Sequence, residues 1–551
     1  MAEDRLGNQQ FIYLPEGASR LLGRDAQRTN IAVGMAVANA VKTALGPKGM
    51  DKMLVSDLGD ITITNDGVTI LEEMNVEHPV AKIMVDIAKT QDKETGDGTT
   101  TVVIVAGELL KGAGELIEQG IHPTTVIKGY KMAAEKAVSI LKERAKKVSI
   151  DDEATLQKIG SVSLGSKNIG DDETKKYLAD IVIKAVKQVM EKDSSGRNFV
   201  DHDQIKVEKK EGGTVADTKL IRGVLIDKEI AHPGMPKSIK NAKVLLLDAA
   251  LEIEKTEVDA KIEITSPEQM QSFLQQEERT LKEMVEKIKK INANVVFTEK
   301  GIDDVAQHFL AKAGIAAVRR VKKSDIEKLA KATGAHIATS LDDLSENDLG
   351  LAGLVEERKI SGEQMVFVED CKNPKSVTIF IRGGTQQVVD EAERSINDVI
   401  GAISSAVEDG KYVYGGGAIE VDLANALRNY ANELGGREQL AVQKFADALE
   451  IIPKTLAESA GMDAIDTLVQ LRSKHKTAED SSYGVDIFNN TVADMSKQGV
   501  LEPMRVKQQA IYSASEAAEI ILRIDDMISS KSKAPATGGG AGGMPQQGME
   551  E

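Results

Sequence analysis

The sequence Gly96-Asp-Gly-Thr-Thr-Thr101 stands directly before an apolar run that begins at Val102, and this arrangement is the most informative feature of the chain. Together with Leu109 and Leu110, the run is long and apolar enough to form a buried helix. Free N–H groups and the positive dipole end at a helix start favour an anion, and glycines allow the backbone to approach it closely. Because the carboxylate of Asp97 would repel phosphates without a cation between them, the stretch predicts a phosphate site with Mg²⁺ on Asp97. A tight turn capped by threonines accounts equally well for six such residues taken alone.

The composition indicates an acidic protein with several aliphatic cores. A length of 551 residues predicts three or four domains, and 41% hydrophobic residues supply enough apolar material for them. The net charge of -17 argues against nucleic acid as the main partner. The chain has no Trp and only 3% aromatic residues, so stacking on bases is an unfavourable binding mode for it.

The cysteine content and the N-terminus bear on the compartment. Cys371 is the only cysteine, which excludes an internal disulfide and a cysteine-based zinc cluster and favours a reducing compartment. The first ten residues lack a basic region followed by an apolar one, and no run reaches the length that spans a bilayer. We therefore expect a cytoplasmic protein without a membrane partner.

The N-terminal third is mainly helical and carries two further glycine motifs. Residues 11–17 are expected to form a short strand or an extended arm, and 25–45 a helix that ends at Leu45-Gly-Pro-Lys-Gly49. That turn would press rigid backbone against a ligand, although a simple helix stop explains it as well. A strand is expected at 60–64, followed by Asn65-Asp66-Gly67 as a two-residue hairpin turn, in which Asp66 is only a turn residue.

The next segments are predicted as three helices and a loop. The helices cover residues 79–120, around the opening motif, 124–145 and 177–190. The loop covers residues 161–167, and its Lys167 is expected to be solvated unless tertiary structure brings it over a ligand.

Between about 220 and 371 the pattern changes to strands alternating with helices, which predicts an α/β domain. Buried strands are expected at 244–247, 295–298 and 315–318. Ser266 and Ser324 are each followed three residues later by Gln or Glu, which predicts two capped helix starts. The first helix should be exposed near Met270 and Phe273, and the charged stretch 252–265 before it is predicted to be a mobile excursion.

The C-terminal part returns to helices. A strand at 377–381 leads through Gly383-Gly384 to a helix that begins near Thr385, with Asp390 in its second turn. The three glycines 415–417 offer a second place for close approach of the backbone to a ligand. Helices follow to about residue 526, and the Gly-rich end, 531–551, is predicted to be a flexible tail.

No stretch fits GxxxxGK[ST], and GDGTTT lacks the third glycine of the GxGxxG fingerprint, so the site is not one of the two commonest phosphate loops. Instead, LGPKG, NDG, GDGTTT, the glycine pair with Asp390, and GGG occur in an order that resembles the chaperonin family over nearly the whole chain. The longer stretches LGPKGMDKML and TNDGVTIL, the charged excursion and the tail resemble the archaeal (group II) thermosome type and, more distantly, the eukaryotic cytosolic chaperonin. The bacterial type lacks the excursion and uses a separate lid.

The resemblance implies a multidomain α and α/β fold with three domains. A mostly helical equatorial ATPase domain would comprise 1–150 and 407–530, and a small α/β intermediate hinge domain would comprise 151–218 and 372–406. An α/β apical domain would comprise 219–371, with a helical lid protrusion at about 249–280. Nucleotide motifs would lie on both sides of the apical insert because the insert interrupts the equatorial domain.

The resemblance also implies roles for single residues, with ATP and Mg²⁺ as ligands. Asp97 would hold Mg²⁺, while Asp66 and Asp390 would act on the attacking water as catalytic residues. Lys167 would sense the nucleotide, and Gly416 and Glu502 would contact the nucleoside. The phosphates would be bound by Leu45, Gly46, Pro47, Gly98, Thr99, Thr100 and Thr101. Tyr414 departs from the family pattern of smaller residues before the three glycines and could alter the fit of the nucleotide.

The implied function is an ATP-driven chaperone that encloses non-native polypeptides under a built-in lid. It would assemble from the same or paralogous subunits into a double ring with eight or nine subunits per ring, without nucleic acid or membrane as a partner. Two alternatives stay open at this level. One is an ATPase that forms a filament or scaffold, and the other is a phosphotransferase acting on a small molecule.

Overall fold

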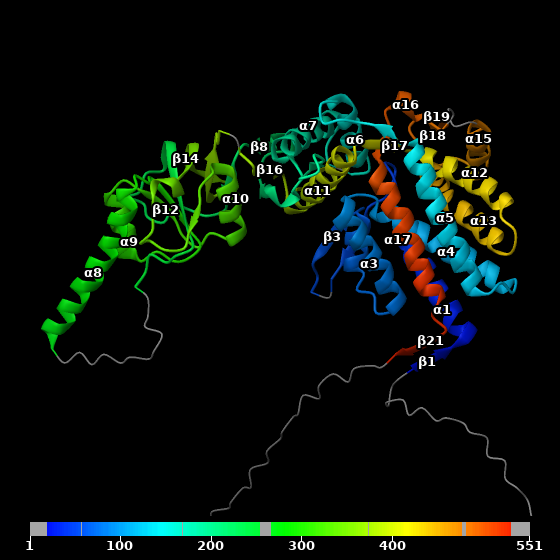
Figure 1. Cartoon of the computed structure of the whole chain (residues 1–551), viewed down its shortest axis with the longest axis horizontal. Coiled ribbons are helices and arrows are strands. Elements are labelled where there is room, and N and C mark those ends of the chain that lie inside the picture. Colours follow the sequence, from blue (N-terminus) through cyan, green and yellow to red (C-terminus); the bar gives the residue numbers. More distant parts are fainter. Residues whose placement is uncertain are drawn as a thin grey trace, which may run out of the picture.

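The structure is a computed structural model that describes residues 19–529, apart from 57, 168, 254–265, 373 and 477–480. Its ribbon is elongated, with helices and sheets arranged in three successive bodies (Figure 1). Each body has its own large hydrophobic core, which we call the first, second and third core in the order in which they are described below. None of the helices in the described ranges combines the length and the apolar character needed to span a membrane.

The first core joins two distant parts of the chain, 37–145 and 413–522. Its centre is α4, Thr99–Glu118, which is buried along most of its length and packs against α1, α3, α13 and α17. The apolar run after GDGTTT therefore forms the buried helix that the sequence predicts. The other helices of this part are α1 Gly23–Lys42, α2 Gly67–Glu73, α3 Pro79–Thr95, α5 Pro123–Arg144, α12 Ala418–Glu433, α13 Glu438–Leu449, α14 Ile451–Ser459, α15 Ala464–Lys474, α16 Met495–Gln498 and α17 Met504–Leu522.

Short strand pairs lie at the edges of the first core. The ends of the described chain pair antiparallel, with Ser19 opposite Ser529. The strands are β1 Ser19–Leu22 with β21 Asp526–Ser529, β2 Lys52–Val55 with β3 Ile61–Thr64, β18 Tyr483–Asp486 with β19 Thr491–Asp494, and β20 Leu501–Pro503, β17 Lys411–Tyr414 and β4 Lys146–Lys147 in one sheet. The strand or arm expected at 11–17 lies outside the described residues, as does the tail at 531–551.

The predicted hairpin turn at Asn65-Asp66-Gly67 is wrong. The β2–β3 hairpin closes earlier, where Gly59 N–H donates to Ser56 O and Ser56 N–H donates to Asp60 O. Gly67 begins α2 instead, and its φ is not positive. A Cβ at position 67 would lie 2.6 Å from Thr100 Oγ1, so this glycine permits close approach to α4.

The second core is the α/β body predicted between 220 and 371. Its main sheet has the order β12-β11-β10-β14-β15-β9, in which β10, β11 and β12 run parallel. The strands are β9 Val224–Ile226, β10 Ser238–Leu247, β11 Val295–Thr298, β12 Ala316–Val318, β13 Ile337–Ala338, β14 Gly350–Ile360 and β15 Glu363–Glu369. The helices are α8 Pro267–Lys290, α9 Asp304–Lys312, α10 Lys323–Thr333 and the short η3 Glu346–Asp348.

One of the two predicted caps is confirmed. Ser266 accepts a hydrogen bond from Gln269 N–H at 3.3 Å and caps α8. Ser324 is not a cap, because α10 begins at Lys323 with Lys322 in the N-cap position. Residues 254–265 of the predicted excursion lie outside the described part.

The third core lies between the other two in Figure 1, and it is formed mainly by two parts of the chain, 148–220 and 377–414. The helices are α6 Glu153–Gly165, α7 Asp172–Val189, α11 Gln386–Asp409, η1 His202–Gln204 and η2 Val215–Asp217. The strands are β5 Glu191–Lys192, β6 Asn198–Phe199, β7 Ile205–Glu211, β8 Lys219–Ile221 and β16 Val377–Gly383. The loop predicted at 161–167 is wrong over most of its length, since α6 continues through Gly165.

Candidate functional site

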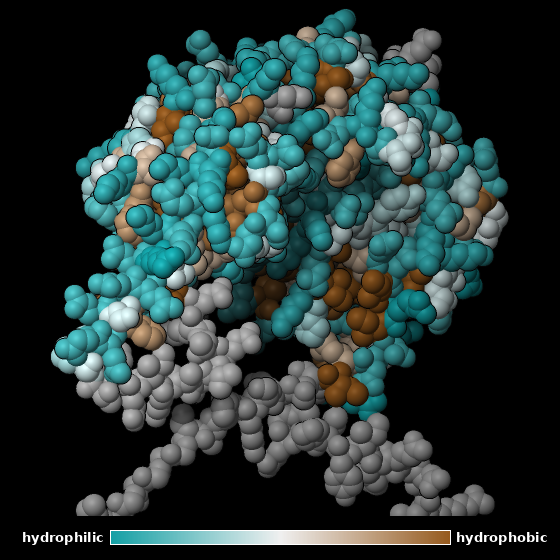
Figure 2. All heavy atoms as spheres, turned by 60° about the vertical axis from the view of Figure 1, so that its left-hand side comes forward, coloured by the Kyte–Doolittle hydropathy of each residue, from teal (hydrophilic) through white to brown (hydrophobic). Residues whose placement is uncertain are grey.

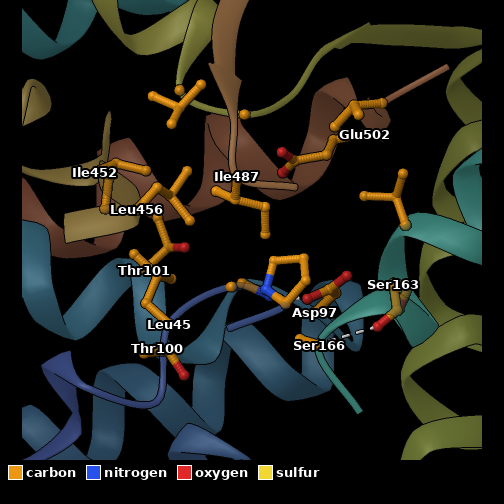
Figure 3. Close-up of a pocket in the computed structure, with 18 of the residues that line it drawn as sticks. Leu45, Asp97, Thr100, Thr101, Ser163, Ser166, Ile452, Leu456, Ile487 and Glu502 are labelled. Atoms are coloured by element: carbon orange, nitrogen blue, oxygen red, sulfur yellow. Dashed lines mark hydrogen bonds between the residues drawn. The ribbon is translucent and has the colours of Figure 1, made fainter. Parts of the chain in front are cut away.

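A pocket of about 260 Å³ lies where the first and third cores meet. Twelve residues singled out in the sequence line it, and Figure 3 shows several of them converging from different elements. They are Leu45, Gly46, Pro47, Asp66, Asp97, Gly98, Thr99, Thr100, Thr101, Lys167, Gly416 and Glu502. The fold therefore brings LGPKG, NDG, GDGTTT, GGG and two isolated charged residues to one place.

The opening motif forms the floor of the pocket. Gly96 ends α3 and Gly98 precedes α4, and both have positive φ, +66° and +81°. This tight turn aims the start of α4 at the pocket. A Cβ at Gly98 would lie 2.7 Å from Val506 Cγ1 and 3.0 Å from Gln91 Nε2, so a larger residue would not fit. Gln91 is buried and fixes the turn by donating to Asp97 O at 2.9 Å.

Two long helices present uncapped N-termini to this pocket. The N-caps of α4 and α12 are Gly98 and Gly417, and neither start has a hydrogen bond from a capping side chain. Helix α2, in contrast, is capped by Asp66. The first N–H groups of α4 are thus the ones available to an anionic ligand, and the helix dipole favours it.

Asp97 fits the role of a metal ligand beside a phosphate. Its Oδ1 accepts from Gly98 N–H at 2.6 Å. Burial raises the pKa of this carboxyl, and the negative charge of Glu502 raises it further. A divalent cation would offset both effects. No group of three His, Cys, Asp or Glu in the described ranges is placed to hold a metal, but Mg²⁺ commonly uses one or two carboxylates with phosphate oxygens and water.

On the opposite wall, Lys167 joins two carboxylates. Its Nζ lies 2.8 Å from Asp398 Oδ2 and 3.8 Å from Asp66 Oδ1, and the three side chains are only 7–12% exposed. Burial alone would lower the pKa of Lys167, but Asp398 and Asp66 raise it, so the ammonium stays charged. The expectation that Lys167 is solvated is wrong. Tertiary structure instead brings Lys167 over the pocket, which is the exception that the sequence analysis allowed.

Asp66 has an environment that keeps it ionised. It accepts hydrogen bonds from Thr69 N–H at 2.9 Å, Thr69 Oγ1 at 2.9 Å and Thr99 Oγ1 at 3.3 Å. Burial raises the pKa of this carboxyl, but the charge of Lys167 and these hydrogen bonds outweigh burial and lower it. Asp66 can therefore accept a proton or a hydrogen bond near neutral pH.

The structure places Asp390 outside the pocket, and Asp398 inside it. The Asp390 side chain is 30% exposed and its Oδ1 lies 2.6 Å from Lys209 Nζ of β7. Eight residues along a helix correspond to about 12 Å, so the two acids of α11 cannot occupy the same position. The resemblance placed Asp390 at the site, but in the structure the acid of α11 that lines the pocket is Asp398.

Asp398 was missed by the sequence reasoning, although a signal for it existed. It lies within the apolar stretch 396–403, where a charged side chain must be buried and needs a partner. Burial raises its pKa well above the usual range, and the Lys167 charge opposes this rise. The other missed residues, such as Ser163, Ile452 and Ile487, come from scattered elements without any local motif.

The far end of the pocket is less polar and contains Gly416 and Gly417, two of the three glycines. Gly416 has φ +65°, and a Cβ there would lie 2.8 Å from Met495 Sδ. Apolar side chains at this end include Ile452, Leu456 and Ile487 (Figure 3). Tyr414 does not line the pocket. It packs against the third core with its ring 6.3 Å from that of Tyr412, so its size has no direct effect on the fit of a ligand.

Contacts across the boundary connect the site to the third core. Thr64 Oγ1 donates to Glu391 Oε2 at 3.2 Å, and Asn65 Nδ2 donates to Ser166 O. A Cβ at Gly401 of α11 would lie 2.6 Å from Gly96 Cα, so the backbones of α11 and the GDGTTT turn nearly touch. A movement of the third core would change the distances between groups that face each other in the pocket.

Comparison with known proteins gives a match over almost the full chain. The model of the TCP-1/cpn60 chaperonin family matches residues 37–532. A thermosome subunit of Methanopyrus kandleri is 58% identical over 95% of each chain, and one of Pyrococcus abyssi is 58% identical over 97% of this chain and 98% of its own. A thermosome subunit beta of Thermococcus kodakarensis is 58% identical over 99% of each chain.

Proposed function

The chain belongs to the TCP-1/cpn60 chaperonin family, and its similarity to thermosome subunits indicates the archaeal, group II type, so we propose that it uses Mg-ATP to enclose non-native polypeptides. The observation that carries this proposal is the convergence of two groups in one pocket. One is the uncapped start of α4 with Asp97, and the other is the Lys167 cluster of Asp66, Lys167 and Asp398.

The start of α4 with Asp97 and the Lys167 cluster would have different roles in phosphoryl transfer. The N–H groups at the start of α4 would bind the phosphates, and Mg²⁺ held by Asp97 would neutralise their charge. Asp66 would orient the attacking water and accept its hydrogen bond, because its carboxyl stays ionised. Asp398, on α11, would approach the same water from the third core. The assignment of Asp398 replaces that of Asp390.

We further propose that the three cores correspond to the three chaperonin domains. The first core would be the equatorial domain, the third core the intermediate hinge, and the second core the apical domain, with boundaries at about 150, 218, 371 and 406. Because Asp398 and Lys167 belong to the third core, movement of that body would complete or open the catalytic arrangement. Hydrolysis would then depend on conformation.

Client binding would use exposed apolar side chains at the far end of α8. Met270, Phe273 and Leu274 are 51%, 39% and 57% exposed, although Leu281, Val285 and Ile288 on the same helix are buried. Their exposure agrees with the expectation for this helix. Figure 2 shows that the face of the molecule turned to the viewer is mainly hydrophilic with separate apolar patches. Non-native polypeptides would bind such patches through non-directional burial.

Assembly into a double ring of the same or paralogous subunits, eight or nine per ring, is part of the proposal, as is a cytoplasmic location. Sixteen copies of the 59.3 kDa chain would weigh roughly 950 kDa and eighteen roughly 1070 kDa. Light scattering with and without Mg-ATP would distinguish these masses. A monomer in both conditions would contradict the proposed assembly. In a separate measurement, ATP hydrolysis without protection of an aggregating client would favour the scaffold role.

The catalytic proposal is tested by two alanine substitutions on the same helix. Asp398→Ala should lower the ATP turnover number by on the order of 10² to 10⁴ while nucleotide binding is largely kept, because it removes a group that acts on the water. Asp390→Ala should change turnover by less than about threefold, because that side chain lies outside the pocket. If Asp390→Ala gave the larger loss, the assignment from the sequence would be restored and ours rejected.

A further inference from the structure

A second buried lysine, Lys507, lines the same pocket. Its Nζ is 2.5 Å from Glu502 Oε2 and 2.8 Å from Glu420 Oε1. The side chains of Lys507 and Glu420 are only 7% and 6% exposed, and that of Glu502 is 22% exposed. Lys507 lies in the first turn of α17, Glu420 in the first turn of α12, and Glu502 on β20, so one ammonium group connects three elements.

The position of Glu502 is fixed from two sides. Its Oε2 faces Lys507, while its Oε1 lies so close to Gly415 that a Cβ there would be 2.3 Å from it. In Figure 3 the carboxylate of Glu502 points into the pocket. The first of the three glycines thus makes room for a carboxylate that Lys507 holds in place.

Charge balance makes Lys507 necessary for this arrangement. Glu420 and Glu502 bring two negative charges into a largely buried region, and Lys507 brings one positive charge. Burial would lower the pKa of Lys507, but the two carboxylates raise it, so the cation persists. The charge of Glu502 is also felt across the pocket, where it raises the pKa of Asp97. Without Lys507, two uncompensated carboxylates would stand beside the place proposed for the phosphates and Mg²⁺.

We propose that Lys507 is a positioning residue for the nucleoside end of the bound nucleotide, an inference that rests on the proposed function. It holds the carboxylate of Glu502 in place, and a carboxylate only accepts hydrogen bonds. The site therefore selects a nucleotide that offers a donor at this end. The donor is either a sugar hydroxyl or an amino group of the base.

The first test uses Lys507→Met, which keeps the length of the side chain and removes its charge. The KM for ATP should rise on the order of tenfold, because the orienting cation is lost. The kcat should stay within about threefold of wild type, because Asp66, Lys167 and Asp398 are untouched. The preference for ATP over an analogue that lacks the relevant donor should also fall toward one.

Two analogues identify the donor. The analogue 2′-deoxy-ATP lacks a sugar hydroxyl, and purine riboside triphosphate lacks the amino group of the base. If Lys507→Met loses the preference for ATP over only one of these analogues, the group that this analogue lacks is the donor. The proposal would be overturned if Lys507→Met kept the wild-type KM for ATP and the wild-type preference over both analogues. It would also be overturned if kcat and kcat/KM fell equally in this variant.

A matched variant separates charge from packing. The cluster of Glu420, Glu502 and Lys507 has a formal charge of -1, Lys507→Met makes it -2, and the double variant Lys507→Met/Glu420→Gln returns it to -1. We expect the double variant to recover part of the ATP affinity. If Lys507→Met fails to fold, Glu420→Gln alone should keep both affinity and donor preference. A loss of that preference in Glu420→Gln would contradict the assignment of the selecting role to Glu502.

The failure of this inference and that of the proposed function are distinguishable in the same experiment. If the wild-type protein does not hydrolyse ATP, the proposed function is wrong. If the wild-type protein hydrolyses ATP and Lys507→Met has the KM and the preferences of wild type, only the role of Lys507 is wrong.

Discussion

Lys167 and Lys507 both line one pocket and have the same local chemistry, a buried ammonium shared by two carboxylates. They differ in what they connect. Lys167 and Asp398 belong to the third core and Asp66 to the first, whereas α17 and α12, which carry Lys507 and Glu420, pack in the first core, and β20, which carries Glu502, contributes Leu501 to the third. The Lys167 cluster is therefore a joint between two bodies, while Lys507 and Glu420 support the site from within the first. Catalysis should depend on the Lys167 cluster and nucleotide affinity on Lys507.

Among the lysine variants, the largest effect should come from Lys167→Met. It leaves Asp66 and Asp398 facing each other in a buried site, and breaking such a cluster commonly costs about 3–5 kcal/mol. If part of this cost falls on the catalytic arrangement, kcat should fall on the order of 10²–10³ while the dissociation constant for ATP changes little. Single-turnover hydrolysis and equilibrium binding measure the two quantities separately.

Lys209→Met is the matched control for that variant. Lys209 also contacts two acids of α11, Asp390 and Glu393, each at 2.6 Å, but its side chain is 31% exposed and lies outside the pocket. Exposed ion pairs contribute only about 0–1 kcal/mol, so turnover should stay within about threefold. Similar losses for Lys167→Met and Lys209→Met would show that the joint has no special role.

A third buried lysine extends the comparison to the other boundary of the third core. Lys206 on β7 lies 2.8 Å from Asp325 Oδ1 of α10 and 3.2 Å from Glu208 Oε2, and it donates to Leu225 O at 2.7 Å. Lys206→Met should weaken the docking of the second core by on the order of 2–3 kcal/mol, because it leaves a buried Asp325 unpaired. Hydrogen exchange in α10 and β9 should then accelerate, with ATP turnover of the same order as wild type.

Lys331→Met tests whether an ion pair between the second and third cores must be buried to hold them together. Lys331 reaches Asp201 at 3.2 Å across the same boundary, but the two side chains are 50% and 35% exposed. Exchange in α10 should change by much less than in Lys206→Met. The reverse order would mean that the exposed pair, and not the buried cluster, holds the second core.

The comparison of the lysines also explains what the sequence could and could not predict. Asp97 and its glycines were found because the acid, the turn and the buried helix are neighbours in the chain. Asp398 and Lys507 contribute equally to the pocket, but each stands in an ordinary helix and acquires its role only when distant elements pack. Asp390 was taken from the resemblance, where it stands with the glycine pair at a visible helix start, and Asp398 was not considered because the depth of a pocket is not visible in the sequence.

Local motifs also misled where tertiary packing decides. Asn65-Asp66-Gly67 is a strong turn signal, yet Asp66 caps α2 and Gly67 serves the approach to Thr100. Serine with glutamate three residues later predicts a cap at Ser324, but α10 starts at Lys323. In contrast, the buried strands of the second core were predicted well, because a short β-branched run between helices has few alternatives.

The smallest predicted effect concerns Asp92, which lies on α3 near the pocket. Within the described residues, its side chain forms no ion pair with a lysine. Burial raises the pKa of its carboxyl from 3.8 to about 6, and the charge of Asp66 contributes. The folded state therefore binds this proton more tightly than the unfolded state, so the contribution of Asp92 to stability falls as pH rises from about 4 to about 6. Asp92→Asn should stabilise the protein above pH 6 by about 1 kcal/mol, a small value because Asp92, like Asp86, is exposed to solvent, and the gain should vanish below about pH 4. Denaturation midpoints of wild type, Asp92→Asn and the exposed control Asp86→Asn between pH 4 and 8 measure it, and a gain independent of pH would show that the charge of Asp92 is not its cause.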